Sequence, residues 1–443
     1  MAGSVLERIH QLDRFGSVLG LERLQSLLKR LGDPQDGMKF IHVAGTNGKG
    51  SVCKFLEGGL SACGYRVGMY ISPYIEVFNE RIQCGGQYIS DEALDRIGNR
   101  VLDEMDAMVA EGEVSPTEFE AVMAIAFMYF AEQEPDIVVL ETGLGGRGDA
   151  TNVIRDPLAC IITTVTFDHT DVLGDTLEKI AGEKAGIIKD GAPVISNVED
   201  RGAAAVIARK AYGEGCRLYD ISKIEYNIDW ESPLGQQVSM DLWGTDYRDM
   251  EISMSGRHQA ENLKTAIAAL EVLRKERKIR MERSALYRGL KEAVWPGRFE
   301  VVGGRESWES GDSSEALIVL DGAHNEAGAS ALAETAGRLF QGKKILMVVG
   351  ILADKDVDAI LDHFTGIRAD FIAASPDNPR RLSAEELCEK LSARGHAPVA
   401  TAEEPAECVR QALDRKGEYD VILFAGSLYL IGAVRRLIGD ERG

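Results

Sequence analysis

Short apolar runs alternate with helical segments along this chain, and that alternation favours an α/β fold. Four runs lie in the first part of the chain: KFIHVAG, RVGMYIS, PDIVVLETG and CIITTVTF. Short runs rich in Val and Ile are typical of strands buried on both faces of a parallel sheet. From Ala316 the alternation of apolar runs and helical segments resumes, with the runs EALIVLDGAHN, KKILMVVG, ADFIAAS and YDVILFAGS. The sequence therefore predicts two α/β regions.

The segment between these regions has a different pattern. The runs RLYDI, IEYNIDW, QQVSMDLW and RDMEISM alternate apolar and polar positions, which predicts a small antiparallel set of strands within 217–254. A helix is expected next, at roughly 258–276. The turn-forming Pro and Gly of WPGRF favour a boundary near Trp295 to Arg298. We therefore predict domains of residues 1–297 and 298–443.

Two further segments have a clear local pattern. Helical spacing runs through residues 4–31, and the turn residues of 32–37 end the predicted helix. The leucines on one face of this helix are Leu21, Leu24, Leu27, Leu28 and Leu31. The polar segment ESWESGDSSE predicts a surface loop.

Composition excludes several classes of protein. The formal charge of -21 disfavours nonspecific attraction to nucleic acid or to an anionic membrane. No stretch approaches the ~20 apolar residues that cross a bilayer, and the first residues lack the apolar core of a signal peptide. The seven cysteines contain no CxxC and are expected to be reduced thiols. A cytoplasmic protein is predicted.

A glycine-rich loop follows the first apolar run, in FIHVAGTNGKGS. Glycines let backbone amides approach a phosphate, the start of a helix favours anions, and a lysine adds positive charge. The spacing is tighter than the general GxxxxGK[ST] pattern, because only two residues separate the first two glycines. A plain turn between strand and helix is the alternative. The predicted phosphate-binding residues are Gly45, Thr46, Asn47, Gly48, Lys49, Gly50 and Ser51.

Polar residues also follow the later apolar runs. Glu141 ends PDIVVLE, and a carboxylate at the carboxyl edge of a parallel sheet can hold a metal ion beside bound phosphate. An ordinary strand-end cap is the other interpretation. Asp168 and His169 follow CIITTVTF, and Lys184 lies in EKAGIIK. Spacing alone leaves His169 open as a loop residue and Lys184 as a solvated lysine.

Nine motifs occur in order along nearly the whole chain: GTNGKGS, the SPxxxxFNERI stretch from Ser72 to Ile82, ETGLGGRxDATN, TFDHTDVLG, EKAGIIK, SGRHQxxN, PGRFE, DGAHN and GSLYL. This series resembles the folylpolyglutamate synthase/dihydrofolate synthase family of the Mur ligase superfamily. The resemblance implies an N-terminal P-loop ATPase-type α/β domain with a small antiparallel β element. It also implies a Rossmann-like α/β C-terminal domain.

The same resemblance implies where ATP and Mg²⁺ bind. The glycine-rich loop would hold ATP, Asn262 would contact adenine, and Arg298 would contact a phosphate. Asp321 and His324 would be nucleotide contacts from the second domain. Lys49, Lys184 and His324 would be the catalytic residues. The implied metal-site residues are Ser51, Ser72, Glu141, His169 and Lys184, the last matching a lysine that the family carbamylates.

For the pteridine substrate, the resemblance implies three segments: Leu19 to Leu21, Thr117 to Glu120, and Gly148 to Ala150. Phe119 could stack on a flat ring or be plain core. Arg380 could bind the carboxylate of the incoming amino acid or be a rim residue. Tyr74 and Gly148 depart from the family's commoner residues. The implied substrate-binding residues are Leu19, Gly20, Leu21, Thr117, Phe119, Glu120, Arg147, Asp149, Ala150, Arg380 and Ser427.

The activity implied by the resemblance is ATP-dependent ligation of L-glutamate to a folate or pteroate carboxylate. An acyl phosphate would form, and ADP and phosphate would be released. The form of the loop at Asp149 to Thr151 favours a bifunctional enzyme, and a monomer is usual in the family. The alternatives are a folylpolyglutamate synthase alone, a P-loop nucleotide hydrolase or switch, a cell-wall Mur ligase, which LGLER and FNERI disfavour, and a binding protein without catalysis.

Overall fold

The computed structural model describes residues 4–12, 19–311 and 315–440. These residues form two compact units, which are described one at a time. Unit 1 comprises Met1–Glu225, Asp241–Asp246 and Asn262–Glu292, and unit 2 comprises Tyr226–Met240, Tyr247–Glu261 and Ala293–Gly443. The division into domains 1–297 and 298–443 stays a prediction.

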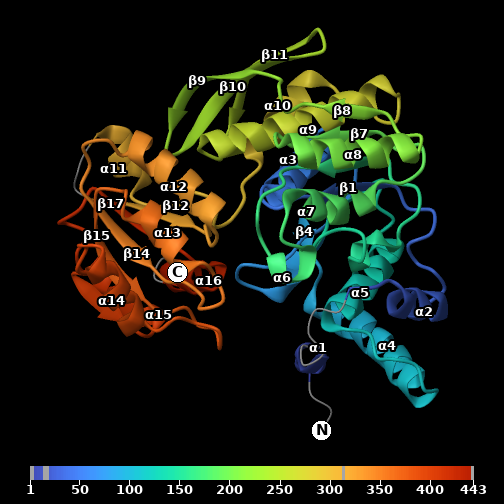
Figure 1. Ribbon diagram of the computed structural model, residues 1–443, viewed down its shortest axis with the longest axis horizontal. Coiled ribbons are helices and arrows are strands. Elements are labelled where there is room, and N and C mark those ends of the chain that lie inside the picture. The colour runs from blue at the N-terminus through green and yellow to red at the C-terminus, as the bar shows by residue number, and fades with distance from the viewer. Residues whose placement is uncertain (1–3, 13–18, 312–314, 441–443) are drawn as a thin grey trace. The chain divides into compact units, whose positions relative to one another are not determined.

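Unit 1 is built on an eight-stranded sheet with the order β4-β3-β2-β5-β1-β6-β7-β8 (Figure 1). The six strands from β2 to β8 in this order run parallel, whereas β3 and β4 are antiparallel additions at one edge. The four predicted parallel strands are confirmed. The strands are β1 (Phe40–Ala44), β2 (Val67–Tyr70), β3 (Ile82–Cys84), β4 (Gln87–Tyr88), β5 (Ile137–Glu141), β6 (Ala159–Ile162), β7 (Val194–Ser196) and β8 (Leu218–Asp220).

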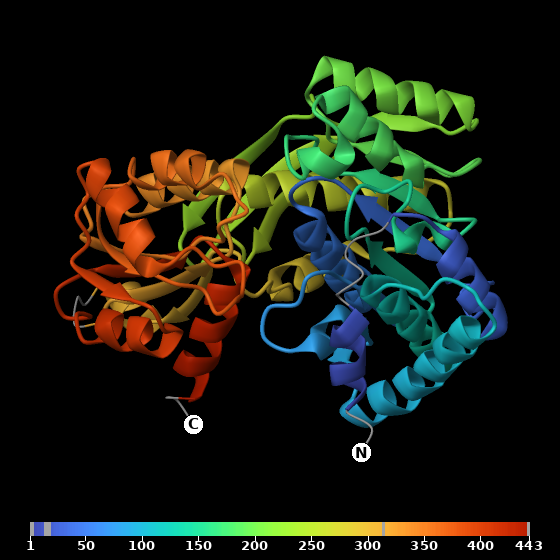
Figure 2. The same cartoon turned by 60° about the horizontal axis from the view of Figure 1, so that its bottom comes forward.

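Helices cover this sheet, and β1, β2, β5 and β6 are wholly buried. Helix α5 is apolar on nearly all sides because it lies inside the unit, with α4 alongside it (Figure 2). The helices are α1 (Val5–His10), α2 (Glu22–Arg30), α3 (Lys49–Ala62), α4 (Asp91–Ala110), α5 (Glu118–Gln133), α6 (Thr170–Leu173), α7 (Leu177–Lys184), α8 (Arg201–Gly213), α9 (Arg257–Lys275) and α10 (Arg283–Glu292). Short 3₁₀ turns are η2 (Phe78–Arg81), η3 (Ala150–Val153) and η4 (Ala185–Ile187).

Unit 2 contains most of a three-stranded sheet, β11-β10-β9, and a six-stranded sheet, β12-β13-β17-β14-β15-β16. The turn between β10 and β11, within Asp241–Asp246, belongs to unit 1. In the larger sheet only β12 is antiparallel to its neighbour. The strands are β9 (Tyr226–Ser232), β10 (Gly235–Leu242), β11 (Thr245–Ile252), β12 (Glu300–Gly303), β13 (Leu317–Asp321), β14 (Ile345–Val349), β15 (Ala369–Ala374), β16 (Ala400–Ala402) and β17 (Val421–Ala425). The helices are α11 (Arg305–Ser310), α12 (Glu326–Leu339), α13 (Val357–Phe364), α14 (Ala384–Ala393), α15 (Pro405–Leu413) and α16 (Leu428–Asp440).

The structure corrects three local predictions. The single helix over residues 4–31 is wrong, because α1 ends at His10 and α2 begins at Glu22; residues 13–18 lie outside the described part. RLYDI does not join the antiparallel set, because β8 pairs in parallel with β7. The ESWESGDSSE segment begins within helix α11 rather than as a loop, and its residues 312–314 lie outside the described part. In each case the local sequence pattern was compatible with more than one secondary structure, and contacts with the rest of the chain determined which one formed.

Within residues 4–12, 19–311 and 315–440, no helix is both long and apolar enough to cross a membrane.

Helices α3 and α10 of unit 1 pack so closely that one position admits only glycine. A Cβ added at Gly289 would lie 2.2 Å from the carbonyl oxygen of Gly58 and 2.7 Å from the Cβ of Ala62. Backbone atoms cannot move aside as a flexible side chain can. The two helices would therefore have to separate to accept any larger residue.

We expect Gly289→Ala to lower the free energy of unfolding by roughly 1–3 kcal/mol, because overpacking forces the backbone apart. Gly213→Ala is the control, since nothing lies within 4 Å of a Cβ at the last residue of α8. That change should stabilise by about 0.5–1 kcal/mol, because glycine is the weaker helix former. Urea unfolding midpoints compare the two variants. Equal midpoints would show that α3 and α10 separate without cost.

Candidate functional site

The glycine-rich loop joins β1 to α3 at the carboxyl edge of the sheet in unit 1. Gly48 caps α3 with φ +83°, a left-handed conformation that favours glycine. Lys49 opens the helix, and its Nζ donates to the carbonyl oxygens of Gly45 at 3.1 Å and Thr46 at 3.2 Å. The lysine thus curls back over the loop. The first amides of α3 and a fixed positive charge together make a cradle for an anion.

A threonine-rich segment after β6 holds the loop in place. The backbone amide of Thr46 donates to the carbonyl of Thr164 at 2.8 Å, and that of Asn47 donates to Thr164 Oγ1 at 3.0 Å. Thr163 Oγ1 donates to the carbonyl of Asn47 at 2.6 Å. A Cβ at Gly45 would lie 1.8 Å from Thr163 Oγ1, so this glycine is required by close approach. Our sequence reasoning missed the threonines, whose signal was their position directly after a buried strand.

Asn262 of α9 lies against the loop. A Cβ at Gly48 would lie 2.2 Å from Asn262 Oδ1. The structure therefore brings this predicted adenine contact to the first turn of α3, although the two are far apart in sequence. Asn262 is 8% exposed, so its amide is presented at the loop rather than to bulk solvent.

Glu141 ends β5 directly beside β1, in register with Val43. Its side chain is 5% exposed, and its Oε2 accepts a hydrogen bond from the backbone amide of Ser72 at 3.2 Å. Ser51 is buried in the first turn of α3. Three of the predicted metal-site residues thus come from a strand end, a loop and the first turn of a helix at this edge of the sheet.

Lys184, at the end of α7, is 3% exposed. Burial and the neighbouring positive charge of Lys49 lower the pKa of Lys184 to about 7, against a smaller opposite effect of Asp168. The interpretation of Lys184 as a solvated lysine is therefore wrong. The amine is neutral in a large part of the molecules at neutral pH.

His169 is the most exposed of the predicted metal-site residues. It adopts φ +50°, and its half-exposed ring places Nε2 3.7 Å from Asp168 Oδ1. In the part of the chain that the structure describes, no three His, Cys, Asp or Glu side chains gather where they could hold a metal ion. A site with few protein ligands is what Mg²⁺ commonly uses, because it retains waters and binds phosphate oxygens.

The three segments predicted to meet the pteridine lie together in unit 1. The amide of Gly20 donates to the carbonyl of Gly148 at 3.1 Å. A Cβ at Gly148 would lie 3.0 Å from the Cβ of Leu19, which accounts for glycine at this position. Leu19 itself is exposed, and Leu21 is partly buried against the core of the unit.

Thr117 and Glu120 form a capping box at the start of α5. Glu120 Oε2 accepts from the Thr117 amide at 2.7 Å, from Thr117 Oγ1 at 2.9 Å and from Arg23 Nε at 3.0 Å. Phe119 packs edge-on against Tyr70, with ring centroids 6.1 Å apart. A Cβ at Gly143 would lie 2.5 Å from Phe119 Cζ, so the ring also touches the loop that carries Asp149.

Asp149 organises that loop from the inside. Its Oδ2 accepts from the amide of Leu144 at 2.8 Å, and its Oδ1 accepts from the amide of Thr151 at 3.0 Å and from Thr151 Oγ1 at 2.5 Å. Thr151 Oγ1 lies 2.9 Å from Nε2 of the buried His42. Burial raises the pKa of Asp149 above its ordinary value, and the hydrogen bonds oppose that rise. Ala150, next in sequence, is buried at the start of η3.

Arg147 lies on the outside of the same loop. Its Nη2 donates to the carbonyl of Gly182 at 3.1 Å, and its Nε lies 3.5 Å from Glu183 Oε1. The loop is therefore tied to α7, the helix that ends on Lys184.

Two charged residues of FNERI have structural roles that we did not predict. Glu80 is buried and accepts hydrogen bonds from the consecutive amides of residues 75–77, at 2.8, 2.8 and 2.9 Å. Arg81 lies over three aromatic rings, at 6.0 Å from Tyr70, 5.5 Å from Phe78 and 5.6 Å from Phe119. The guanidinium thus supports the ring of Phe119.

Unit 2 carries the remaining predicted residues. Asp321 ends β13, is buried, and accepts from the amides of Phe299 and Ala323, both at 2.8 Å. Burial raises its pKa, and the charge of Arg298 opposes the rise. His324 Nδ1 lies 2.7 Å from the carbonyl of Gly322.

The two residues predicted near the incoming amino acid differ in exposure. Arg380 is half-exposed and forms an ion pair with Asp354 at 2.8 Å. Ser427 is buried before α16, and its Oγ accepts from the amide of Tyr429 at 3.2 Å.

The buried Lys184 yields a test of stability against pH. Its folded-state pKa lies below its unfolded value, so the cost of burying the charge is fully present below pH 7 and falls as pH rises towards 10.5. We expect Lys184→Met to gain most stability over the wild type below pH 7. The gain should shrink above pH 7 by at most about 1.4 kcal/mol per pH unit. Urea unfolding at a series of pH values measures it.

The control for the Lys184 test is Lys179→Met, which removes an exposed lysine from the same helix. A gain for Lys184→Met that does not change between pH 6 and 10 would contradict a lowered pKa.

Two family models match the chain along most of its length. The Mur ligase middle domain matches residues 43–270, and the Mur ligase glutamate ligase domain matches residues 297–428. The dihydrofolate synthase/folylpolyglutamate synthase of Bacillus subtilis is 38% identical over 430 residues, which are 97% of this chain and 97% of that protein.

Two solved structures agree with this chain over nearly their whole length. The Escherichia coli protein, in complex with DHPP and ADP, is 28% identical, has a TM-score of 0.85, and is matched over 100% of this chain and 99% of its own. A bifunctional folylpolyglutamate synthase/dihydrofolate synthase with Mn, AMPPNP and L-glutamate bound is 29% identical, has a TM-score of 0.81, and is matched over 100% and 99%. The predicted two-domain Mur-ligase-like α/β fold is confirmed.

The order of the motifs, the glycine loop that packs on Asn262, and the strand end at Glu141 all fall within the matched ranges. On this evidence the chain belongs to the folylpolyglutamate synthase/dihydrofolate synthase family of Mur ligases.

Proposed function

We propose that this protein joins L-glutamate to the carboxylate of a folate or pteroate, using ATP. The observation that carries the proposal is the loop from Gly45 to Ser51, packed on Asn262 and set beside Glu141 at one edge of the sheet. The Bacillus subtilis relative is named dihydrofolate synthase/folylpolyglutamate synthase, and similar chains have been solved with ADP and with AMPPNP and L-glutamate.

The proposed reaction has two steps. A carboxylate oxygen of the folate or pteroate attacks the γ-phosphorus of ATP, the bond to the bridging oxygen breaks, and ADP leaves. The amino nitrogen of glutamate then attacks the acyl carbon, loses a proton, and displaces phosphate. Lys49 and the amides at the start of α3 offset negative charge on the phosphates during the first step. No nucleophile from the protein is needed.

Mg²⁺ fits the donors that the chain offers. Glu141 supplies a carboxylate, Ser51 and Ser72 supply hydroxyls, and His169 supplies a ring nitrogen near the same edge of the sheet. We propose that these residues hold the metal. When bound, the ion would neutralise charge on the phosphates. Glu141 is the one carboxylate among these four residues, and the remaining coordination positions of the ion can be taken by phosphate oxygens and waters.

Carbamylation of Lys184 is chemically reasonable because burial lowers its pKa to about 7, so that a substantial fraction of the amine is neutral near pH 7. A neutral amine is the form that adds carbon dioxide, and the product carries a carboxylate in place of a positive charge. That change removes the repulsion with Lys49. We propose that the modified Lys184 is a second anionic metal ligand.

The acceptor is proposed to bind where the three segments of unit 1 meet. Phe119 offers a ring face, and Asp149 lies beneath the loop that Phe119 touches. Leu19 is exposed above Gly148, and Gly20, Leu21, Thr117, Glu120, Arg147 and Ala150 complete the proposed set. An aromatic ring beside polar loop groups suits a flat heterocycle with polar edges.

For residues of unit 2, we propose the roles that the sequence motifs imply. Arg298, Asp321 and His324 are proposed to act on the nucleotide, with His324 and Lys49 as catalytic residues. Arg380 and Ser427 are proposed to bind the incoming glutamate. The half-exposed guanidinium of Arg380 suits a carboxylate, which would compete with Asp354.

We further propose a bifunctional, monomeric and cytoplasmic enzyme that makes dihydrofolate and extends the glutamate tail. A folylpolyglutamate synthase alone is the second candidate. The Bacillus subtilis relative bears both names, whereas the Lacticaseibacillus casei relative is named only as a folylpolyglutamate synthase.

Product analysis separates these activities. Purified protein with ATP, Mg²⁺ and L-glutamate should convert dihydropteroate to dihydrofolate and should lengthen the glutamate tail of tetrahydrofolate. Mass spectrometry identifies both products. A ladder on tetrahydrofolate alone would reduce the activity to folylpolyglutamate synthesis. ATP hydrolysis at the same rate with and without an acceptor would instead support a hydrolase or switch.

Gly48→Ala tests the nucleotide role of the loop. The added Cβ would meet Asn262 Oδ1 at 2.2 Å and would also strain a left-handed backbone. We expect ATP to bind at least about tenfold more weakly, measured by isothermal titration calorimetry. Gly64→Ala is the matched control, because Gly64 has φ +93° and nothing within 4 Å. The Gly64→Ala variant therefore introduces the strain of a left-handed backbone without any contact of the added Cβ. Equal loss in both variants would show that contact with Asn262 is unimportant.

A further inference from the structure

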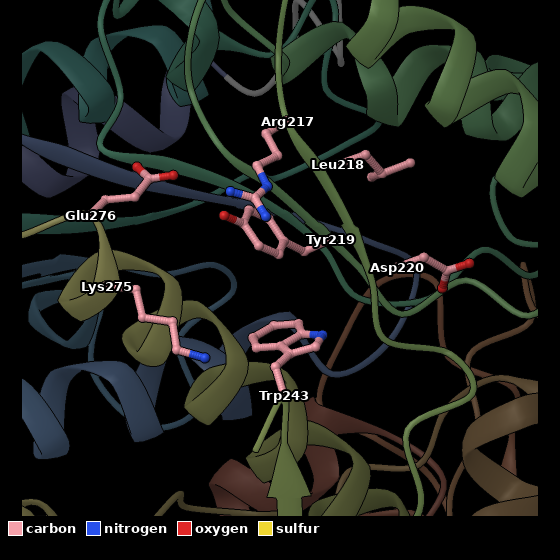
Figure 3. Close-up of a pocket in the computed structure, with 7 residues that line it drawn as sticks. All are labelled: Arg217, Leu218, Tyr219, Asp220, Trp243, Lys275 and Glu276. Carbon is pink, nitrogen blue, oxygen red and sulfur yellow. The ribbon is translucent and has the colours of Figure 1, made fainter. Parts of the chain in front are cut away.

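A pocket in unit 1 is lined by residues that the proposed reaction does not use. Its volume is about 480 Å³, within the range of small-molecule sites. The lining residues are Arg217, Leu218, Tyr219, Asp220, Trp243, Lys275 and Glu276 (Figure 3). They come from edge strand β8, from the turn between β10 and β11, and from the end of α9.

The pocket lies away from the glycine-rich loop. β8 is the last strand of the sheet, and β6 and β7 separate it from β1. Because neighbouring strands lie about 4.8 Å apart, β8 lies about 14 Å from β1, the strand that leads into the glycine-rich loop. None of its lining residues is among the proposed nucleotide, metal or acceptor contacts.

Two aromatic rings and two cations face this pocket. The rings of Tyr219 and Trp243 lie with centroids 5.3 Å apart and planes at 58°, and Figure 3 shows them approaching from opposite walls. The guanidinium of Arg217 lies 4.8 Å from the centre of the Tyr219 ring. The ammonium of Lys275 lies 5.4 Å from the centre of the Trp243 ring. Trp243 is nevertheless 42% exposed, so part of its ring is open to a ligand.

A buried carboxylate fixes these groups in place. Glu271 is fully buried, accepts from Thr245 Oγ1 at 2.7 Å, and lies 3.3 Å from Lys275 Nζ. It thereby ties the turn that carries Trp243 to the helix that carries Lys275. Trp243 itself adopts φ +53°, which is uncommon for a bulky residue and is supported by the bond from the Gly244 amide to Asp241. The walls of the pocket are therefore ordered before any ligand binds.

The lining side chains can bind three parts of one ligand: a planar ring, a phosphate and hydroxyl groups. A partly exposed indole can stack on a planar heterocycle, and Arg217 and Lys275 can pair with a phosphate. Asp220 and Glu276 are acceptors for hydroxyl groups. We propose that this pocket binds a nucleoside monophosphate, at a site separate from the catalytic nucleotide site. Such a ligand would report on the nucleotide pool while the ligase site is occupied.

Binding of AMP tests the proposal. Calorimetry with the wild-type protein should detect AMP binding that persists in Lys49→Ala, a variant of the catalytic loop. Trp243→Gly should weaken that binding about tenfold or more, because it removes the stacking ring while glycine accepts the left-handed backbone. Arg217→Ala should weaken it severalfold and leave glutamate ligation unchanged, since Arg217 is an exposed residue outside the proposed catalytic set.

The matched control is Trp230→Ala, which removes an exposed tryptophan on β9 that does not line the pocket. Its AMP affinity should equal that of the wild type. Loss of all AMP binding in Lys49→Ala would overturn the proposal, because AMP would then occupy only the catalytic site. Unchanged AMP affinity in Arg217→Ala and Trp243→Gly would overturn it as well, and neither result depends on whether the protein ligates glutamate.

Discussion

Close packing around the glycine-rich loop is the constraint on which the site depends. The loop is pressed between the threonines that follow β6 and Asn262 of α9, with no room for a Cβ at Gly45 or Gly48. The same packing positions the first turn of α3 next to the strand end that carries Glu141. The proposed phosphate-binding loop, the proposed metal ligand Glu141 and Asn262 therefore all lie at the same edge of the sheet.

Buried charge is the second organising feature of unit 1. Lys184 and Asp149 are both nearly inaccessible, and burial moves their pKa values in opposite directions, downward for the amine and upward for the carboxylate. Each shift favours the uncharged form. Asp149 is compensated by amides and by Thr151, whereas Lys184 has a like charge beside it. A buried amine whose nearby carboxylate, Asp168, offsets only part of the lowering of its pKa is a candidate for a functional position.

The sequence predicted the parallel strands, the glycine loop and the family, because each depends on local pattern or on motif order. It did not predict that β8 joins the main sheet, since RLYDI alternates as an antiparallel strand would and only its neighbour decides the pairing. The threonine clamp, the anchoring of residues 75–77 by Glu80 and the support of Phe119 by Arg81 were also missed. Each of these depends on contacts formed only when the chain folds, and the spacing of residues along the sequence does not reveal such contacts.

The contact between Leu19 and Gly148 links positions on two loops that are far apart in sequence. The Gly20 amide donates to the Gly148 carbonyl at 3.1 Å, which holds the two loops together. A Cβ at position 148 would lie 3.0 Å from the Leu19 Cβ and 3.3 Å from the Gly20 amide nitrogen, so the backbone at 19–20 would have to move by a few tenths of an ångström to accept it. A substitution at 148 would therefore also change the surface at Leu19.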